Sequence, residues 1–389
     1  MSSAFARFAS CAALSLLVCA ASAAPAKAGA GSKKAASNEP LVLDGADNFV
    51  VQNRGALVEL TGNVRFHRGD VKMSSRRAVW DRAADQVRFD GDFRLDHPAG
   101  TLTSQSGRYE RSSGSAWADG AAKLRDSSGG TTLEAGRIHY NRPNRRAEAS
   151  FGPVFRRMSG PDSARDTTEI AADLLVWRET DSVAEAKGRV KLRRGKLEAT
   201  CGSAVLDQKT RKLILDDAPF ARLENRNLSG ESMVLDVNLK KEKIEKVLVL
   251  KDARGDVVGD PDSAGVSSVA RVFGDTLLAE VDGDALRSLL VTRKAKGISW
   301  NTTDTTRRDE LSGDTLRLDF EGGKMRAAFI RGHAKSTYHH MDKSVLKGRN
   351  VANGQTIRIA FRDGRIQRVR VEGAAKGTYY GTERRKPVE

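Results

Sequence analysis

Two segments decide the fold class: residues 60–66, LTGNVRF, and residues 86–95, QVRFDGDFRL. In each segment apolar side chains stand at every second position, as Val64 and Phe66 do in the first. A period of two is the signature of a β-strand with one buried and one solvated face. The two segments therefore predict half-buried β-strands.

Polar turns and glycines punctuate these strands. Residues 82–85 form a polar turn, and Gly91 stands between the runs 86–90 and 91–95. Gly, Asn and Asp are residues that tight turns favour. We therefore expect many short strands, with Gly91 separating two of them.

The unit of strand, turn, strand and glycine repeats along the chain. Copies begin at 78–81, 106–110, 137–140 and 173–177, weaker copies lie at 203–207 and 232–236, and a related form occurs at 274–278, 313–320 and 354–361. Self-similarity of this kind indicates a solenoid, a propeller or a stacked array. Segments 235–237 and 246–249 predict a hairpin over a charged turn.

The first 23 residues have the pattern of a secretory signal. Arg7 supplies the positive charge, residues 11–20 are apolar but too short to span a bilayer, and residues 21–23 read Ala-Ser-Ala. Lipidation at Cys19 is an alternative, although Val18 is bulky where a small residue is preferred. We expect an extracytoplasmic protein that begins with a flexible linker at 24–38.

The chain of 389 residues carries a formal net charge of +16, from 66 Lys and Arg against 50 Asp and Glu. Such a charge favours a phosphate-rich or carboxylate-rich partner, or a solvated surface that prevents strand edges from pairing. The basic residues are scattered, which favours the second interpretation for most of them. Aromatic and basic residues do not cluster together, so we expect no nucleic-acid partner.

The sequence contains no pattern of a catalytic or metal site. HExxH, Walker A, GxGxxG, GxSxG and CxxC are all absent. Adjacent strand residues point to opposite faces, so His339 and His340 make a poor chelate. Cys201 follows the signal without a partner cysteine, and we expect it to be a small buried hydrophobe. We therefore expect no enzymatic activity, no cofactor and no metal.

Four segments in series carry a resemblance to a known family. Residues 60–64, 75–81, 90–95 and 100–104 together resemble the OstA-like domain of the LptA-type periplasmic lipopolysaccharide-transport family. The resemblance covers about residues 40–250 and is looser over 270–380. Each motif is short, whereas their ordered series is specific.

The resemblance implies an all-β fold, an elongated and twisted β-jellyroll. Its two splayed sheets would form a V-shaped stack of tandem hairpins around an open apolar groove. Acyl chains of lipopolysaccharide would lie in this groove. The implied role is to bridge the inner and outer membranes from the periplasm. The implied partners are an inner-membrane lipopolysaccharide-export complex, an outer-membrane translocon and further copies of the chain, joined head to tail.

Alternate apolar residues are the candidates for the groove lining. They are Val58, Leu60, Val64, Phe66, Val71, Met73, Val87, Phe89, Phe93, Leu95, Val190, Leu192, Leu197, Leu213 and Leu215. Basic residues expected near the groove mouth, as contacts for head-group phosphates, are Arg65, Arg68, Lys72, Arg189, Lys191 and Arg193. A closed core and a solvated surface are the alternatives for these two sets.

The expected organisation after the linker has four parts. An OstA-like jellyroll occupies 39–255, a connector 256–271, a second repeat region 272–382 and a basic tail 383–389. A structural or adhesive envelope β-solenoid without a lipid ligand is the alternative to lipid transport.

Overall fold

The computed structural model describes residues 40–381 apart from 99, 128, 142, 160–165, 179, 195–196, 208, 224, 239–242, 259–265, 283–284, 322–323, 343–344 and 363–364. The expected signal, linker and basic tail lie outside the described residues. Most of the described chain is β-strand, no α-helix occurs in it, and η2 (Asn53–Gly55) is a short 3-10 turn. The all-β fold class is confirmed.

The chain divides into two compact units. The N-terminal unit runs to residue 195 and includes 202–211, whereas the C-terminal unit holds 196–201 and continues from 212. The strands of the N-terminal unit are β1 (Val42–Gly45), β2 (Asn48–Gln52), β3 (Leu57–Arg68), β4 (Val71–Asp81), β5 (Gln86–His97), β6 (Gly100–Glu110), β7 (Ser115–Asp126), β8 (Thr131–Asn141), β9 (Arg146–Ser150), β10 (Val154–Ser159), β11 (Asp166–Ala171), β12 (Leu174–Arg178) and β13 (Val183–Arg194).

The residues of β14 (Leu197–Asp207) are shared between the two units. The other strands of the C-terminal unit are β15 (Lys212–Asp216), β16 (Phe220–Leu223), β17 (Arg226–Ser229), β18 (Ser232–Asn238), β19 (Lys243–Val258), β20 (Ser268–Asp282), β21 (Ala285–Asn301), β22 (Asp304–Glu321), β23 (Lys324–Asp342), β24 (Val345–Arg362), β25 (Arg365–Glu372) and β26 (Lys376–Gly381). The expected hairpin is present as β18 and β19, which pair antiparallel.

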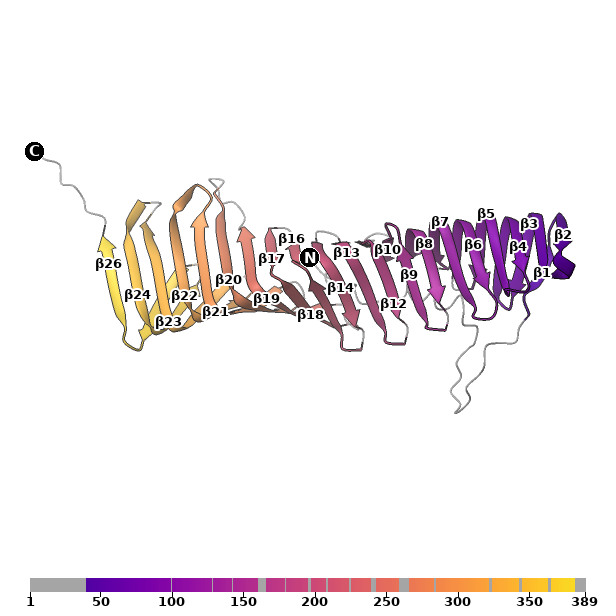
Figure 1. Ribbon diagram of the computed structural model, residues 1–389. Coiled ribbons are helices and arrows are strands. Elements are labelled where there is room, and N and C mark those ends of the chain that lie inside the picture. Colours follow the sequence, from indigo (N-terminus) through magenta and orange to yellow (C-terminus); the bar gives the residue numbers. More distant parts are fainter. Residues whose placement is uncertain are drawn as a thin grey trace, which may run out of the picture. The chain divides into compact units, whose positions relative to one another are not determined.

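The described strands belong to one 26-stranded antiparallel sheet, and the two halves of some long strands in the N-terminal unit pair with different strands. In β3, residues 57–61 pair with β2, whereas residues 65–67 pair with β1. In β13, residues 183–187 pair with β12 and residues 191–194 pair with β11. We call the layer of this sheet that holds 57–61 sheet A and the layer that holds 64–68 sheet B. Figure 1 shows β3 to β8 side by side in chain order.

A bend in the middle of alternate strands carries the chain from one sheet to the other. In β3 the bend is Gly62-Asn63, with φ of 72° and 46°, and the register with β4 shifts at this point. Such left-handed residues form a bulge that bends a strand without ending it. A Cβ on Gly62 would lie 2.1 Å from an Asp47 carboxylate oxygen, so glycine is required there.

The expectation that Gly91 separates two strands is wrong. β5 runs from Gln86 to His97, and Gly91 lies inside it with a φ of 74°. The ladder with β6 continues on both sides of the bend. The glycine bends the strand, because a bulge costs the ladder one position and leaves the flanking pairs intact.

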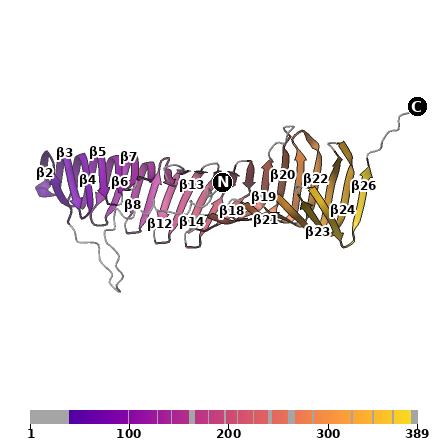
Figure 2. The ribbon, with the colours of Figure 1, turned by 180° about the vertical axis from the view of Figure 1, so that it is seen from behind.

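The C-terminal unit repeats this arrangement with longer strands. β20 to β24 stand side by side in chain order (Figures 1 and 2) and contain 15 to 19 residues each. We call the sheet that holds 276–282 of β20 sheet C and the sheet that holds 268–273 sheet D. Five residues directly opposite one another in sheet C are 0% exposed: Leu277, Val291, Leu316, Ile330 and Ile357.

Parts of the expected connector 256–271 belong to strands. Asp256 in β19 stands opposite Arg271 in β20, and the Arg271 Nε lies 2.6 Å from an Asp256 carboxylate oxygen. The two compact units instead adjoin in sequence between residues 195 and 212.

Candidate functional site

The structure places the predicted lining residues on the inner faces of the sheets. All of them except Val71 are buried, with at most 6% of the residue exposed, and Val71 at the start of β4 is partly exposed. The N-terminal unit holds Val58 to Leu95 of this set with Val190 and Leu192, and the C-terminal unit holds Leu197, Leu213 and Leu215. Inner-face residues alternate with polar ones, because successive strand side chains point to opposite faces.

Aromatic rings fill the first part of this interior. Phe66 makes edge-to-face contacts with Trp80 and Phe89, with ring centroids 5.7 and 5.8 Å apart. Phe89 lies 4.9 Å from Phe93, and the Phe93 ring occupies the space where a Cβ on Gly107 would stand. These side chains pack against one another, so an acyl chain could lie here only if the rings moved apart.

Arg68 links the two sheets of the N-terminal unit at their turn edges. It ends β3 in sheet B and is 8% exposed. Its Nη1 donates hydrogen bonds of 2.8 Å to the hydroxyl of Tyr109 and to the carbonyl of Arg111, both at the end of β6 in sheet A. Of the six predicted head-group residues, Arg68 is the one that reaches the interior.

The other five predicted head-group residues are exposed and do not gather at one place. Four of them alternate along their strands with buried residues, so their side chains point to the outer face: Arg65, Lys72, Lys191 and Arg193. Arg189 lies at the bend of β13, where its guanidinium is 2.6 Å from a carboxylate oxygen of Asp173. This hydrogen bond lowers the pKa of the Asp173 carboxyl below its usual value.

Sequence reasoning missed Arg194. This residue ends β13 and is 1% exposed. It follows the buried residues Val190 and Leu192 at the same spacing of two, so this alternation along the strand could have placed it on the inner face. Its position at the end of β13 in sheet B corresponds to that of Arg68 at the end of β3.

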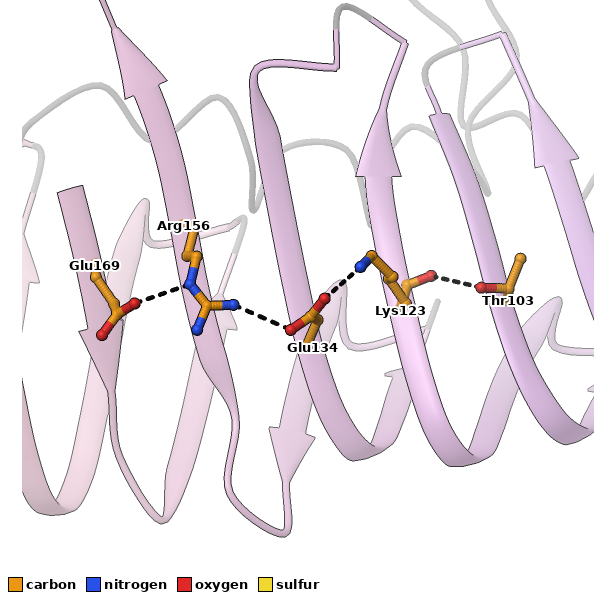
Figure 3. Close-up of polar contacts among 5 residues, drawn as sticks. All are labelled: Thr103, Lys123, Glu134, Arg156 and Glu169. Atoms are coloured by element: carbon orange, nitrogen blue, oxygen red, sulfur yellow. Dashed lines mark hydrogen bonds and ion pairs between the residues drawn. The ribbon is translucent and has the colours of Figure 1, made fainter. Parts of the chain in front are cut away.

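Ion pairs cover part of the outer face of sheet B (Figure 3). Lys123 pairs with Glu134, whose carboxylate also accepts a 3.0 Å hydrogen bond from Arg156 Nη1. Arg156 Nε donates a further hydrogen bond of 2.8 Å to Glu169. The hydrogen bond from Lys123 is the main cause that lowers the pKa of the Glu134 carboxyl. Here the basic residues are neutralised by their neighbours.

Cys201 is buried, and burial raises the pKa of its thiol to about 11. Within the described ranges, His, Cys, Asp and Glu side chains form no group of three that could hold a metal ion. His339 Nδ1 instead lies 2.9 Å from a carboxylate oxygen of Asp309. Among the same residues, no helix is long and apolar enough to cross a bilayer.

Comparison with solved structures shows a weak likeness. No protein-family model and no curated protein matches the chain. Among solved structures, the chain is similar to LptH, the LptA homologous periplasmic component of the conserved lipopolysaccharide transport device from Pseudomonas aeruginosa. The two are 13% identical, the match covers 38% of this chain and 82% of LptH, and the TM-score is 0.19. A TM-score this low carries no argument about fold or function.

Proposed function

We propose that this protein binds lipopolysaccharide in the periplasm and carries it from the inner to the outer membrane. The observation that supports the proposal is the apolar interior, lined by alternate residues of successive strands. Acyl chains need such a surface, because burial contributes about 25 cal/mol per Å² and requires no hydrogen bond. Carriage of this kind requires no catalytic residue, and we propose that the protein is not an enzyme.

The acyl chains would enter between the turn edges of sheets A and B. The bends at Gly62 and Gly91 join the two sheets covalently, so the sheets could separate only on the opposite side. Separation would break the Arg68 hydrogen bonds and exchange ring–ring contacts for contacts between rings and acyl chains. Because both kinds of contact are apolar, their exchange would cost little free energy, and the broken hydrogen bonds of Arg68 would be the main cost.

The exposed edge strands support docking of protein partners. In β2, which pairs with β3, Phe49 is 67% exposed and Val50 and Val51 are 55% and 53% exposed. Exposed apolar edge strands are templates for an added strand. We propose that an inner-membrane export complex, an outer-membrane translocon or further copies of the chain pair with such edges. The N-terminal signal would direct the protein to the periplasm, and lipidation at Cys19 remains the alternative.

Photocrosslinking tests the proposal directly. A photoreactive amino acid at Phe93, which is 1% exposed, should crosslink to lipopolysaccharide in cells, whereas one at the adjacent exposed Arg94 should not. Depletion of the protein should also stop the arrival of lipopolysaccharide at the cell surface. Equal crosslinking at both positions, or continued arrival after depletion, would refute transport. Absence of crosslinking with a normal fold would instead favour the envelope β-solenoid.

A further inference from the structure

Arginines from three strands gather on the outer face of sheet C. Phe329 in β23 stands between two of them, opposite Arg317 in β22 on one side and opposite Arg358 in β24 on the other. Arg358 in turn stands opposite Arg370 in β25. The neighbours of these arginines in sequence, such as Leu316 and Ile357, are buried, so this row faces outward.

The row borders a surface depression of about 500 Å³. Ala327 and Ala360 lie opposite each other in the adjacent row, and Arg368 follows Ala360 in that row. All three line the depression with the other arginines and Phe329, and so does Asp319, which stands opposite Ala327 in the same row. The two alanines leave open space between the longer side chains.

The arginines of this depression carry more positive charge than their neighbours neutralise. Arg317 lies 2.8 Å from a carboxylate oxygen of Asp319, and Arg370 lies 2.8 Å from one of Glu372. For Arg358 and Arg368, no ion pair is present within the part of the chain that the structure describes. Like charges directly opposite one another weaken a sheet, yet Arg358 and Arg370 occupy such a pair.

Phe329 holds Arg358 without neutralising it. The Arg358 guanidinium carbon lies 5.0 Å from the centre of the Phe329 ring. A cation over an aromatic face is attracted by the ring, and guanidinium groups stack well on such faces. The contact holds the guanidinium against the ring and leaves its positive charge uncompensated.

The chemistry of this depression fits a phosphomonoester. Such a group carries about −1.5 to −2 charge at neutral pH and three acceptor oxygens. Arginine binds phosphate oxygens through paired, charge-assisted hydrogen bonds. A carboxylate carries a single charge and would leave one of the two unpaired arginines uncompensated.

We propose that the outer face of sheet C binds a phosphorylated sugar. Arg358 and Arg368 hold its phosphomonoester, with Arg370 beside them, and the sugar ring occupies the space over Ala327 and Ala360. The site lies on the face opposite to the apolar interior, so it does not depend on lipid carriage.

Titration calorimetry on the full chain at low ionic strength tests this proposal. Glucose 6-phosphate should bind saturably, glucuronate should bind at least about tenfold more weakly, and glucose should not bind. Loss of a charge-assisted hydrogen bond costs roughly ten- to hundredfold in affinity, which is the weakening we expect for Arg358→Gln and Arg368→Gln. The matched control is Arg222→Gln, an exposed arginine on β16, and its affinity should stay within about twofold of the wild type.

Thermal unfolding separates binding from folding defects. Without ligand, Arg358→Gln should be about as stable as the wild type, because the removal of a like-charge pair offsets the lost contact with Phe329. Glucose 6-phosphate should raise the melting temperature of the wild type and of Arg222→Gln, but not that of Arg358→Gln. Absence of saturable binding, or equal weakening in Arg222→Gln, would overturn the proposal. Binding to phosphatidic acid vesicles without binding to the soluble sugar phosphate would also overturn it, in favour of a membrane surface.

Discussion

Substitution of Gly107 by alanine tests how closely the interior of the N-terminal unit is packed. A Cβ on Gly107 would lie 2.4, 2.5 and 2.6 Å from three atoms of the Phe93 ring. Phe93 is 1% exposed and lies against Phe89, with ring centroids 4.9 Å apart, so it has little room to retreat. Overpacking of this kind costs about 1–3 kcal/mol. Replacing a strand glycine returns about 0.5–1 kcal/mol through backbone entropy.

The expected net loss for Gly107→Ala is therefore about 1 kcal/mol in the free energy of unfolding, the difference between the midpoints of these two ranges. Urea unfolding, followed by the fluorescence of the four tryptophans, measures the change. Three of them, Trp80, Trp117 and Trp177, lie in the N-terminal unit, and Trp300 lies in the C-terminal unit. Phe93→Ala removes all three ring atoms that clash, so the double variant should lose clearly less than the sum of the two single losses. Gly377→Ala is the control, because nothing lies within 4 Å of its added Cβ. An undiminished stability of Gly107→Ala, or strict additivity in the double variant, would show that the interior yields freely.

Three further changes test other parts of the structure. Arg68→Met should lower the free energy of unfolding by roughly 3 kcal/mol, because it removes two hydrogen bonds from a charged donor. The same variant should bind more of a hydrophobic dye. Unchanged dye binding would argue against a link between the sheets at their turn edges. The pKa of the Glu134 carboxyl is lowered mainly by Lys123, so its stabilising contribution is complete above the unfolded-state pKa and is lost as pH falls through the folded-state pKa. Glu134→Gln should therefore flatten the acid side of the stability profile, and an unaltered profile would contradict this role. Cys201, with a thiol pKa of about 11 against an ordinary 9.0, should react with iodoacetamide at least about a hundredfold more slowly in the folded protein than in urea; equal rates would contradict its burial.

The sequence by itself determined which residues face inward. Parity along a strand is a local property, because each side chain points opposite to its neighbour whatever the strand pairs with. Val64 and Phe66 could therefore be assigned to the buried face before any partner strand was known. The same count would have placed Arg68 and Arg194 inside, but Arg68 was assigned by its charge to a groove mouth and Arg194 was assigned to no site.

The tertiary structure decided what depends on register and on bending. Gly91 reads as a break between strands, and only its positive φ inside a continuous ladder shows that it carries β5 from one sheet to the other. The gathering of Phe329, Arg358 and Arg370 depends on the register of three strands whose pairing is set by turns and bulges. A shift of one residue would turn each of these side chains to the opposite face. Local periodicity contains no information about that register, so residues distant in sequence could not be assigned to one site beforehand.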